Sequence, residues 1–147
     1  MMRLLLVFVF CIAPVYVNAE QYICSATYDD GSGTLTSTIE SVDGGYSAFF
    51  VETSPFVDNA SSREESYLLK PSYSGGGMTI AMKNGQSLSL MKHDGVKLDV
   101  YFVDFETMGF TESSVYGGKY PLTLTSGEVL KEDMNQIYRV GSCVKRD

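Results

Sequence analysis

Alternation of apolar and polar side chains with a period of two is the feature that most limits how this chain can fold. Residues 34–42 place Leu35 and Ile39 on one side and a series of threonines on the other, and residues 96–105 alternate in the same way. Successive side chains of a β-strand point to opposite faces, and β-branched residues favour strand over helix. The chain is therefore predicted to consist mainly of strands.

Short turn sequences divide these runs into hairpins. Asn84 and Gly85 separate two alternating runs, residues 78–83 and 86–91. Asn-Gly between such runs is a strong hairpin signal, because both residues tolerate positive φ. We predict an antiparallel hairpin with Asn84 and Gly85 as the two central residues of a primed turn.

The regular spacing of these runs predicts the fold class. We expect an all-β domain, or a mainly β domain with one short helix, built as a single antiparallel β-barrel or sandwich of about 7–9 short strands. Residues 54–66 contain Pro55 and a run of charged residues, which predicts a polar loop or a poorly formed turn of helix. Residues 126–134 are predicted to form the short helix, with Ser126 as its N-cap.

The first 19 residues have the layout of a secretory signal. The charge of Arg3 precedes an apolar run, and Val17 and Ala19 are small residues at the positions that signal peptidase recognises. The apolar run is shorter than the roughly 20 residues that span a bilayer. We predict that residues 1–19 are cleaved and that residues 20–147 form one mostly β domain, exported to the periplasm or the extracellular space.

Removal of this segment leaves two cysteines, Cys24 and Cys143, close to the two ends of the mature chain. An even pair of cysteines in an oxidising compartment predicts a disulfide. Closing a loop of roughly 120 residues stabilises a fold by about 4–5 kcal/mol in the chain-entropy model. The alternative is a pair of free thiols.

The charge of the chain limits its partners. There are 18 acidic and 11 basic residues, a formal charge of −7, and loss of Arg3 makes the mature chain more negative by one. Nucleic acids and anionic membrane surfaces repel such a protein, so we expect neither as a partner after signal cleavage. The charge suits a soluble protein or one that binds a basic protein.

Segments that resemble catalytic or metal-binding motifs lack residues that those motifs require. His93 is the only histidine, so a triad or a zinc site would lack partners. The segment from Asp29 to Gly33 has glycine at two positions where a calcium loop needs oxygen ligands. Asp99, Asp104 and Glu106 are interpreted as the solvent-facing side of a strand rather than as an acid–base pair. We therefore expect no catalytic residue, no metal ligand and no cofactor.

Two functions remain open at this point. The first is a small binding or inhibitory module that presents an acidic, tyrosine-bearing surface to a protein partner, because tyrosine supplies rigid amphipathic contact area. The second is a β-barrel carrier that holds a small apolar ligand in its interior. A large apolar cavity would favour the carrier, and a filled core with exposed aromatic side chains would favour the binding module.

Overall fold

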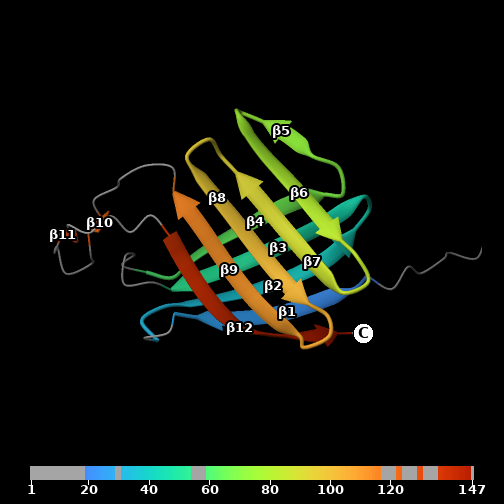
Figure 1. The fold of residues 1–147 in the computed structure, drawn as a ribbon, viewed down its shortest axis with the longest axis horizontal. Coiled ribbons are helices and arrows are strands. Elements are labelled where there is room, and N and C mark those ends of the chain that lie inside the picture. Colours follow the sequence, from blue (N-terminus) through green and yellow to red (C-terminus); the bar gives the residue numbers. More distant parts are fainter. Residues whose placement is uncertain are drawn as a thin grey trace, which may run out of the picture.

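A computed structural model describes residues 19–28, 31–53, 59–116, 122–123, 129–130 and 136–146 (Figure 1). These residues form strands and no helix. The strands, in chain order, are β1 (Gln21–Thr27), β2 (Thr34–Val42), β3 (Gly45–Thr53), β4 (Ser61–Leu68), β5 (Ser72–Ser74), β6 (Gly77–Lys83), β7 (Ser87–His93), β8 (Lys97–Asp104), β9 (Gly109–Tyr116), β10 (Leu122–Thr123), β11 (Val129–Leu130) and β12 (Gln136–Arg146).

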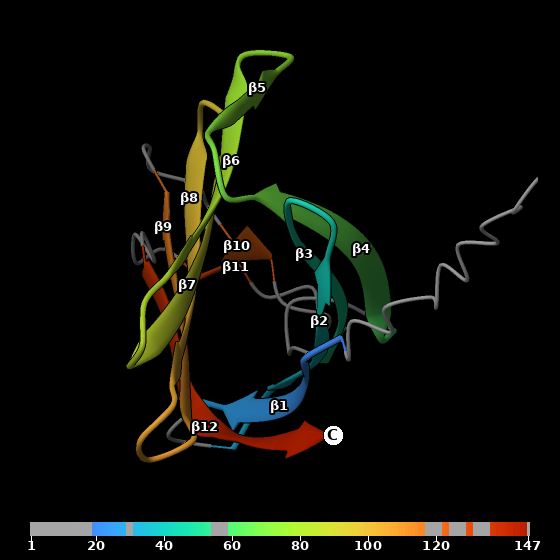
Figure 2. The ribbon, with the colours of Figure 1, turned by 90° about the vertical axis from the view of Figure 1, so that its right-hand side faces the viewer.

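Ten of these strands form one antiparallel sheet in the order β4-β3-β2-β1-β12-β9-β8-β7-β6-β5, and β10 pairs with β11 separately. The sheet curls so that β4 and β6 lie side by side without pairing, and it therefore forms a nearly closed barrel (Figure 2). The predicted all-β antiparallel fold is confirmed, and of the two architectures left open, barrel and sandwich, the structure has the barrel. The predicted number of strands is close to the ten in the sheet. The gap in backbone pairing between β4 and β6 is called the seam below.

Alternation within each strand decides which side chains point into the barrel. In β2, Leu35, Ser37 and Ile39 are buried, whereas Thr36 and Glu40 are exposed or half-buried on the outside. Since the period of a strand is two, the apolar series predicted from the sequence faces inward along its length. The interior is therefore a packed core.

Aromatic rings fill the middle of the barrel. Phe50, Tyr67, Tyr101 and Phe110 are fully buried, and the rings of Phe50 and Tyr101 stack with centroids 4.4 Å apart. The smaller buried side chains around them are Cys24, Ala26, Ile39, Ala48, Ala81, Leu88, Leu90 and Val103. Burying a large apolar side chain stabilises a fold by roughly 1.5–3 kcal/mol, so these rings account for much of the core energy.

The predicted disulfide is present. Cys24 of β1 and Cys143 of β12 are directly opposite each other on neighbouring strands, with Cα atoms 3.9 Å apart. It joins residues 119 positions apart in the chain. A disulfide in the structure is compatible with an oxidising compartment, and the predicted cleavage after Ala19 and the export of residues 20–147 stay predictions.

Close approach of β1 and β12 explains the glycine beside this disulfide. Gly141 points inward, and a Cβ atom at this position would lie 1.8 Å from the carbonyl oxygen of Ser25. No side chain fits there without a shift of the backbone, so glycine is required at this point of β12, a strand that curves along its length (Figure 2).

Three consecutive turns are stabilised by the same hydrogen-bonding pattern. Asn84, Asp94 and Asp104 each accept hydrogen bonds on Oδ1 from the backbone N–H groups two and three residues further on. Such Asx turns satisfy the turn backbone with a side chain. For the two aspartates, these hydrogen bonds from the backbone hold the pKa of the carboxyl below its usual value.

The structure corrects three sequence-based predictions. The hairpin of β6 and β7 is confirmed, but Asn84 is the first residue of its turn and neither it nor Gly85 has positive φ. Residues 61–66 of the predicted segment belong to β4, and the charged side chains of Arg63 and Glu65 have partners inside the barrel. Within the predicted helix, residues 129–130 form β11, and the rest of that segment lies outside the described residues.

Candidate functional site

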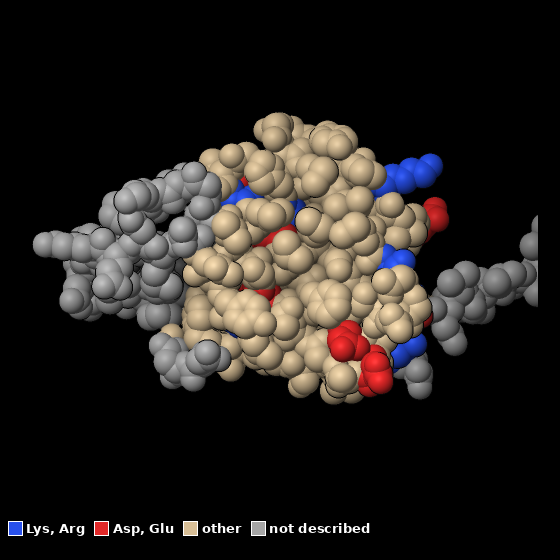
Figure 3. Space-filling model, viewed as in Figure 1, with Lys and Arg blue, Asp and Glu red and all other residues tan. Residues whose placement is uncertain are grey.

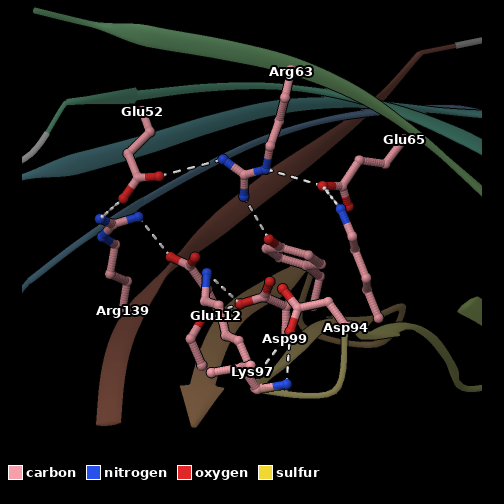
Figure 4. Close-up of polar contacts among 12 residues, drawn as sticks. Glu52, Arg63, Glu65, Asp94, Lys97, Asp99, Glu112 and Arg139 are labelled. Carbon is pink, nitrogen blue, oxygen red and sulfur yellow. Dashed lines mark hydrogen bonds and ion pairs between the residues drawn. The ribbon is translucent and has the colours of Figure 1, made fainter. Parts of the chain in front are cut away.

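A chain of alternating charges crosses the interior of the barrel. Arg139 of β12 pairs with Glu112 of β9 at 2.7 Å and with Glu52 of β3, and Glu52 in turn contacts Arg63 of β4 at 3.3 Å (Figure 4). β12 and β3 are separated by two strands in the sheet, so this contact spans the interior rather than running along a face. The chain therefore connects opposite walls of the barrel.

The same chain continues across the seam. Arg63 contacts Glu65 at 3.2 Å and donates a hydrogen bond to the hydroxyl of Tyr101 at 2.6 Å, and Glu65 pairs with Lys92 of β7 at 2.7 Å. Tyr67 also donates a hydrogen bond to Glu65. Because no backbone pairing joins β4 to β6, these side-chain contacts hold the seam together.

Burial and neighbouring charges act against each other on the two most buried glutamates. Burial alone would raise the pKa of Glu65, but hydrogen bonds from Lys92 and Tyr67 and the charges of Lys92 and Arg63 outweigh it and lower the pKa. At Glu112 burial dominates and raises the pKa, although the charge of Arg139 opposes it. The shift thus favours the ionised form of Glu65, whereas at Glu112 burial favours the protonated form and the charge of Arg139 favours the ionised one.

Asp99 lies inside the barrel, which corrects its interpretation as solvent-facing. The residue is 6% exposed, and its carboxylate accepts a hydrogen bond from Ser114 and pairs with Lys97 at 2.7 Å. Asp104 is the last residue of β8, and Glu106 lies in the turn that follows. Each buried carboxylate therefore has a specific cation or hydroxyl partner, and the arrangement serves to connect strands.

The outside of the barrel differs between its two halves. On the half formed by β1 to β4, one row of outward side chains runs Ile23, Thr38, Phe49, Glu64 across the four strands. Phe49 is 47% exposed, and a hollow beside it is lined by Ile23, Thr36, Ser37, Thr38, Phe49 and Val51. The outward side chains of this set, together with the two glutamates, are called the acidic face: Ile23, Thr36, Thr38, Phe49, Val51, Glu40 and Glu64.

Polar contacts hold the two carboxylates of the acidic face in place. Ser47 donates a hydrogen bond to Glu64 at 3.1 Å, and Gln21 donates one to Glu40. Both glutamates remain on the outer surface, on either side of the exposed ring of Phe49. The acidic face thus combines a hollow of apolar and hydroxyl side chains with negative charge at its edge.

Most described tyrosines do not lie on the surface. Tyr22, Tyr46, Tyr67 and Tyr101 are buried, and Tyr28 is half-buried with its hydroxyl accepting a hydrogen bond from Arg139. The exposed ones are Tyr73 and Tyr138, which lie away from the acidic face. The expected tyrosine-bearing acidic surface is therefore an acidic face whose exposed aromatic side chain is Phe49.

The remaining residues considered for metal binding are His93 and the segment 29–33. His93 is exposed at the end of β7, opposite Met78 and Leu98. Of the calcium candidate, only residues 31–33 are described, and they form a bend. In the described part of the chain, no three side chains of histidine, cysteine, aspartate or glutamate are grouped so that they could hold a metal ion.

Comparison with protein-family models found no match, and neither did comparison with curated proteins or with solved structures. Among the described residues there is no helix with the length and apolar character needed to cross a membrane.

Proposed function

We propose that this protein is an exported binding or inhibitory module that contacts a basic protein partner through the acidic face. The observation that carries the proposal is the position of Phe49, a large exposed ring directly opposite Glu64 and next to a hollow lined by apolar and hydroxyl side chains. An exposed aromatic side chain supplies contact energy in an interface, and neighbouring carboxylates attract a basic partner.

The filled interior favours binding over ligand transport. Four fully buried rings occupy the middle of the barrel, and the polar half of the interior is taken up by ion pairs. A carrier for an apolar ligand needs a cavity of roughly 300–1,000 Å³ lined mostly by apolar side chains. The described interior side chains occupy that space themselves, which leaves the outer surface as the place for a partner.

The charges inside the barrel favour binding over catalysis. Glu65 and Glu112, the most buried glutamates, are engaged by Lys92 and Arg139, and Asp99 is engaged by Lys97 and Ser114. An acid–base pair must reach a substrate with at least one free oxygen in a cleft. The hollow on the acidic face is lined by apolar and hydroxyl side chains instead.

Affinity capture with the mature protein tests this proposal. We expect wild-type protein, starting at Glu20 by intact mass, to retain a basic protein from the fluid into which it is exported. Phe49→Lys should lose this partner, because it removes the ring and reverses the local charge. Phe102→Lys is the matched control, since Phe102 is an exposed phenylalanine on the opposite half of the barrel.

Salt dependence provides the second measurement. Attraction between the acidic face and a basic partner acts through unscreened charge, so the affinity should fall as ionic strength rises. Equal capture by wild type and Phe49→Lys would refute the assignment of the face. Stoichiometric binding of a fluorescent fatty acid inside the barrel would support the carrier instead.

A further inference from the structure

The half of the barrel formed by β6–β9 and β12 has an outer surface on which uncharged side chains predominate, and the most prominent acidic and basic side chains gather at its edges (Figure 3). Its outward side chains form three rows that cross all five strands in register. The rows are Met82–Ser89–Phe102–Thr111–Val140, Ile80–Met91–Val100–Ser113–Tyr138 and Met78–His93–Leu98–Val115–Gln136. These side chains, called the neutral face, include no aspartate, glutamate, lysine or arginine.

Several of these side chains are well exposed. Tyr138 is 53% exposed, Met82 48%, Val140 45% and Val115 43%. Tyr73 of β5 is opposite Met78 and extends the third row. An apolar surface of this kind on a chain with a formal charge of −7 is unusual, because charged side chains normally cover the outside of a sheet.

The size of the neutral face suits a protein contact. Strands about 4.8 Å apart and outward residues about 6.7 Å apart along each strand give on the order of 500 Å² for five strands and three rows. Two such faces in contact bury on the order of 1,000 Å², which is about the area that a specific interface needs. The neutral face is thus large enough to form an interface without other elements.

The net negative charge of the chain indicates which partner the neutral face can bind. Two copies of this chain repel each other wherever their acidic residues meet, and the neutral face is where they can approach without like charges opposite each other. An acidic partner would gain nothing from this face, and a basic partner would find its counter-charges on the other half of the barrel. The least repulsive arrangement for two copies is therefore neutral face against neutral face.

The shape of the surface is compatible with self-association. Large side chains such as Phe102, Met91 and Tyr138 alternate with the small side chains of Ser89, Thr111 and Ser113. In a two-fold dimer the same patch serves both subunits, so it must carry ridges as well as hollows. Homodimer interfaces are also more apolar than other protein contacts.

We propose that the neutral face is the interface of a homodimer, in which β6–β9 and β12 of one copy pack on the same strands of a second copy. The acidic faces of the two copies then point away from the interface. This inference is independent of the proposed function, because the two faces lie on different halves of the barrel and share no residue.

Sedimentation equilibrium of the purified, disulfide-bonded mature protein tests the inference. We expect a monomer–dimer equilibrium for wild type. Phe102→Lys and Tyr138→Lys should each raise the dimer dissociation constant by about tenfold or more, because each buries an unpaired charge in the interface. Phe49→Lys is the matched control and should leave dimerisation unchanged. Added salt should strengthen the dimer or leave it unchanged, since it screens repulsion between acidic copies.

Two results would overturn the homodimer. One is a monomer at all concentrations for wild type. The other is a dimer that Phe49→Lys weakens while both neutral-face variants leave it intact. Monomeric protein that binds vesicles of neutral phosphatidylcholine through Phe102 would assign the face to a lipid surface instead. Any of these results leaves the capture experiment on the acidic face to be judged separately, because that experiment depends on Phe49.

Discussion

Replacing Arg139 by methionine tests whether the charge chain inside the barrel stabilises it. Arg139 is fully buried, and its guanidinium contacts Glu112, Glu52 and the hydroxyl of Tyr28. Methionine keeps most of the volume but leaves the carboxylate of Glu112, which is 2% exposed, without its cation. Glu52 keeps its contact with Arg63, so the uncompensated charge is that of Glu112.

The expected loss of stability follows from the one buried charge that is left without a partner, that of Glu112. Removing one partner of a buried ion pair costs about 3–5 kcal/mol, because the remaining charge stays desolvated. Burial already raises the pKa of Glu112 in the wild type, and loss of Arg139 removes the charge that opposes this rise. The folded variant therefore binds a proton that the unfolded chain releases, so its stability falls as pH rises. Glu112 has one pKa in the folded wild type and a higher one in the folded variant. Between these two values, the stability that the variant loses relative to wild type grows by up to about 1.4 kcal/mol per pH unit.

Urea unfolding at pH 5 and pH 8, monitored by tyrosine fluorescence with the disulfide intact, measures both effects. We expect a larger difference between Arg139→Met and wild type at pH 8 than at pH 5. Arg146→Met, an exposed arginine in the same strand, is the matched control and should stay within about 0.5 kcal/mol of wild type. A loss below about 1 kcal/mol at pH 8, or one that does not change with pH, would refute the reasoning.

Three further changes probe other parts of the barrel. Replacing Cys24 and Cys143 by serine should lower the free energy of unfolding by about 2–5 kcal/mol in denaturant titrations, and an unchanged midpoint would contradict a role for the disulfide in stability. Gly141→Ala should lower the free energy of unfolding by about 3 kcal/mol, because the added Cβ would lie 1.8 Å from the backbone of Ser25. A variant as stable as wild type would show that β1 and β12 can move apart at no cost. The pKa of Glu65 is lowered in the folded state, so ionised Glu65 contributes to the free energy of unfolding. This contribution is fully present above the ordinary pKa of 4.5 and is lost as pH falls through the folded-state pKa. The stability difference between wild type and Glu65→Gln should therefore be largest near neutral pH and shrink in acid, and a difference that grows on acidification would exclude Glu65 as the ionised partner of Lys92.

The sequence predicts the fold well because its strongest signals are local. Alternation in residues 34–42 and 96–105 specifies strand and face together, and turn residues such as Asp43 and Asp94 mark where strands reverse. The two cysteines add one long-range contact that spacing and compartment alone suggest. These signals are sufficient for an antiparallel barrel without any knowledge of which strands meet across its interior.

The interior charges could not be predicted in the same way. The run Arg63-Glu64-Glu65 looks like a solvated loop, but in β4 its first and last members point inward and only Glu64 points outward. One partner lies on the preceding strand β3, but the others, on β7 and β8, are 27 and 38 residues away in the chain. A strand with charges at alternate positions has the same pattern whether the charged side faces water or a polar interior, so only the three-dimensional structure separates the two.

The pairing of β1 with β12 also constrains the order in which the barrel can assemble. β1 can pair with β2 as soon as both are made, but its other edge faces a strand more than a hundred residues later. Contacts between such distant segments slow folding, because a large loop must close before they form. Until β12 arrives, β1 and β9 each present an unpaired edge to the surroundings. A ribosome-bound or truncated chain that lacks β12 is therefore the species most exposed to aggregation, and barrel closure is a late, whole-chain event.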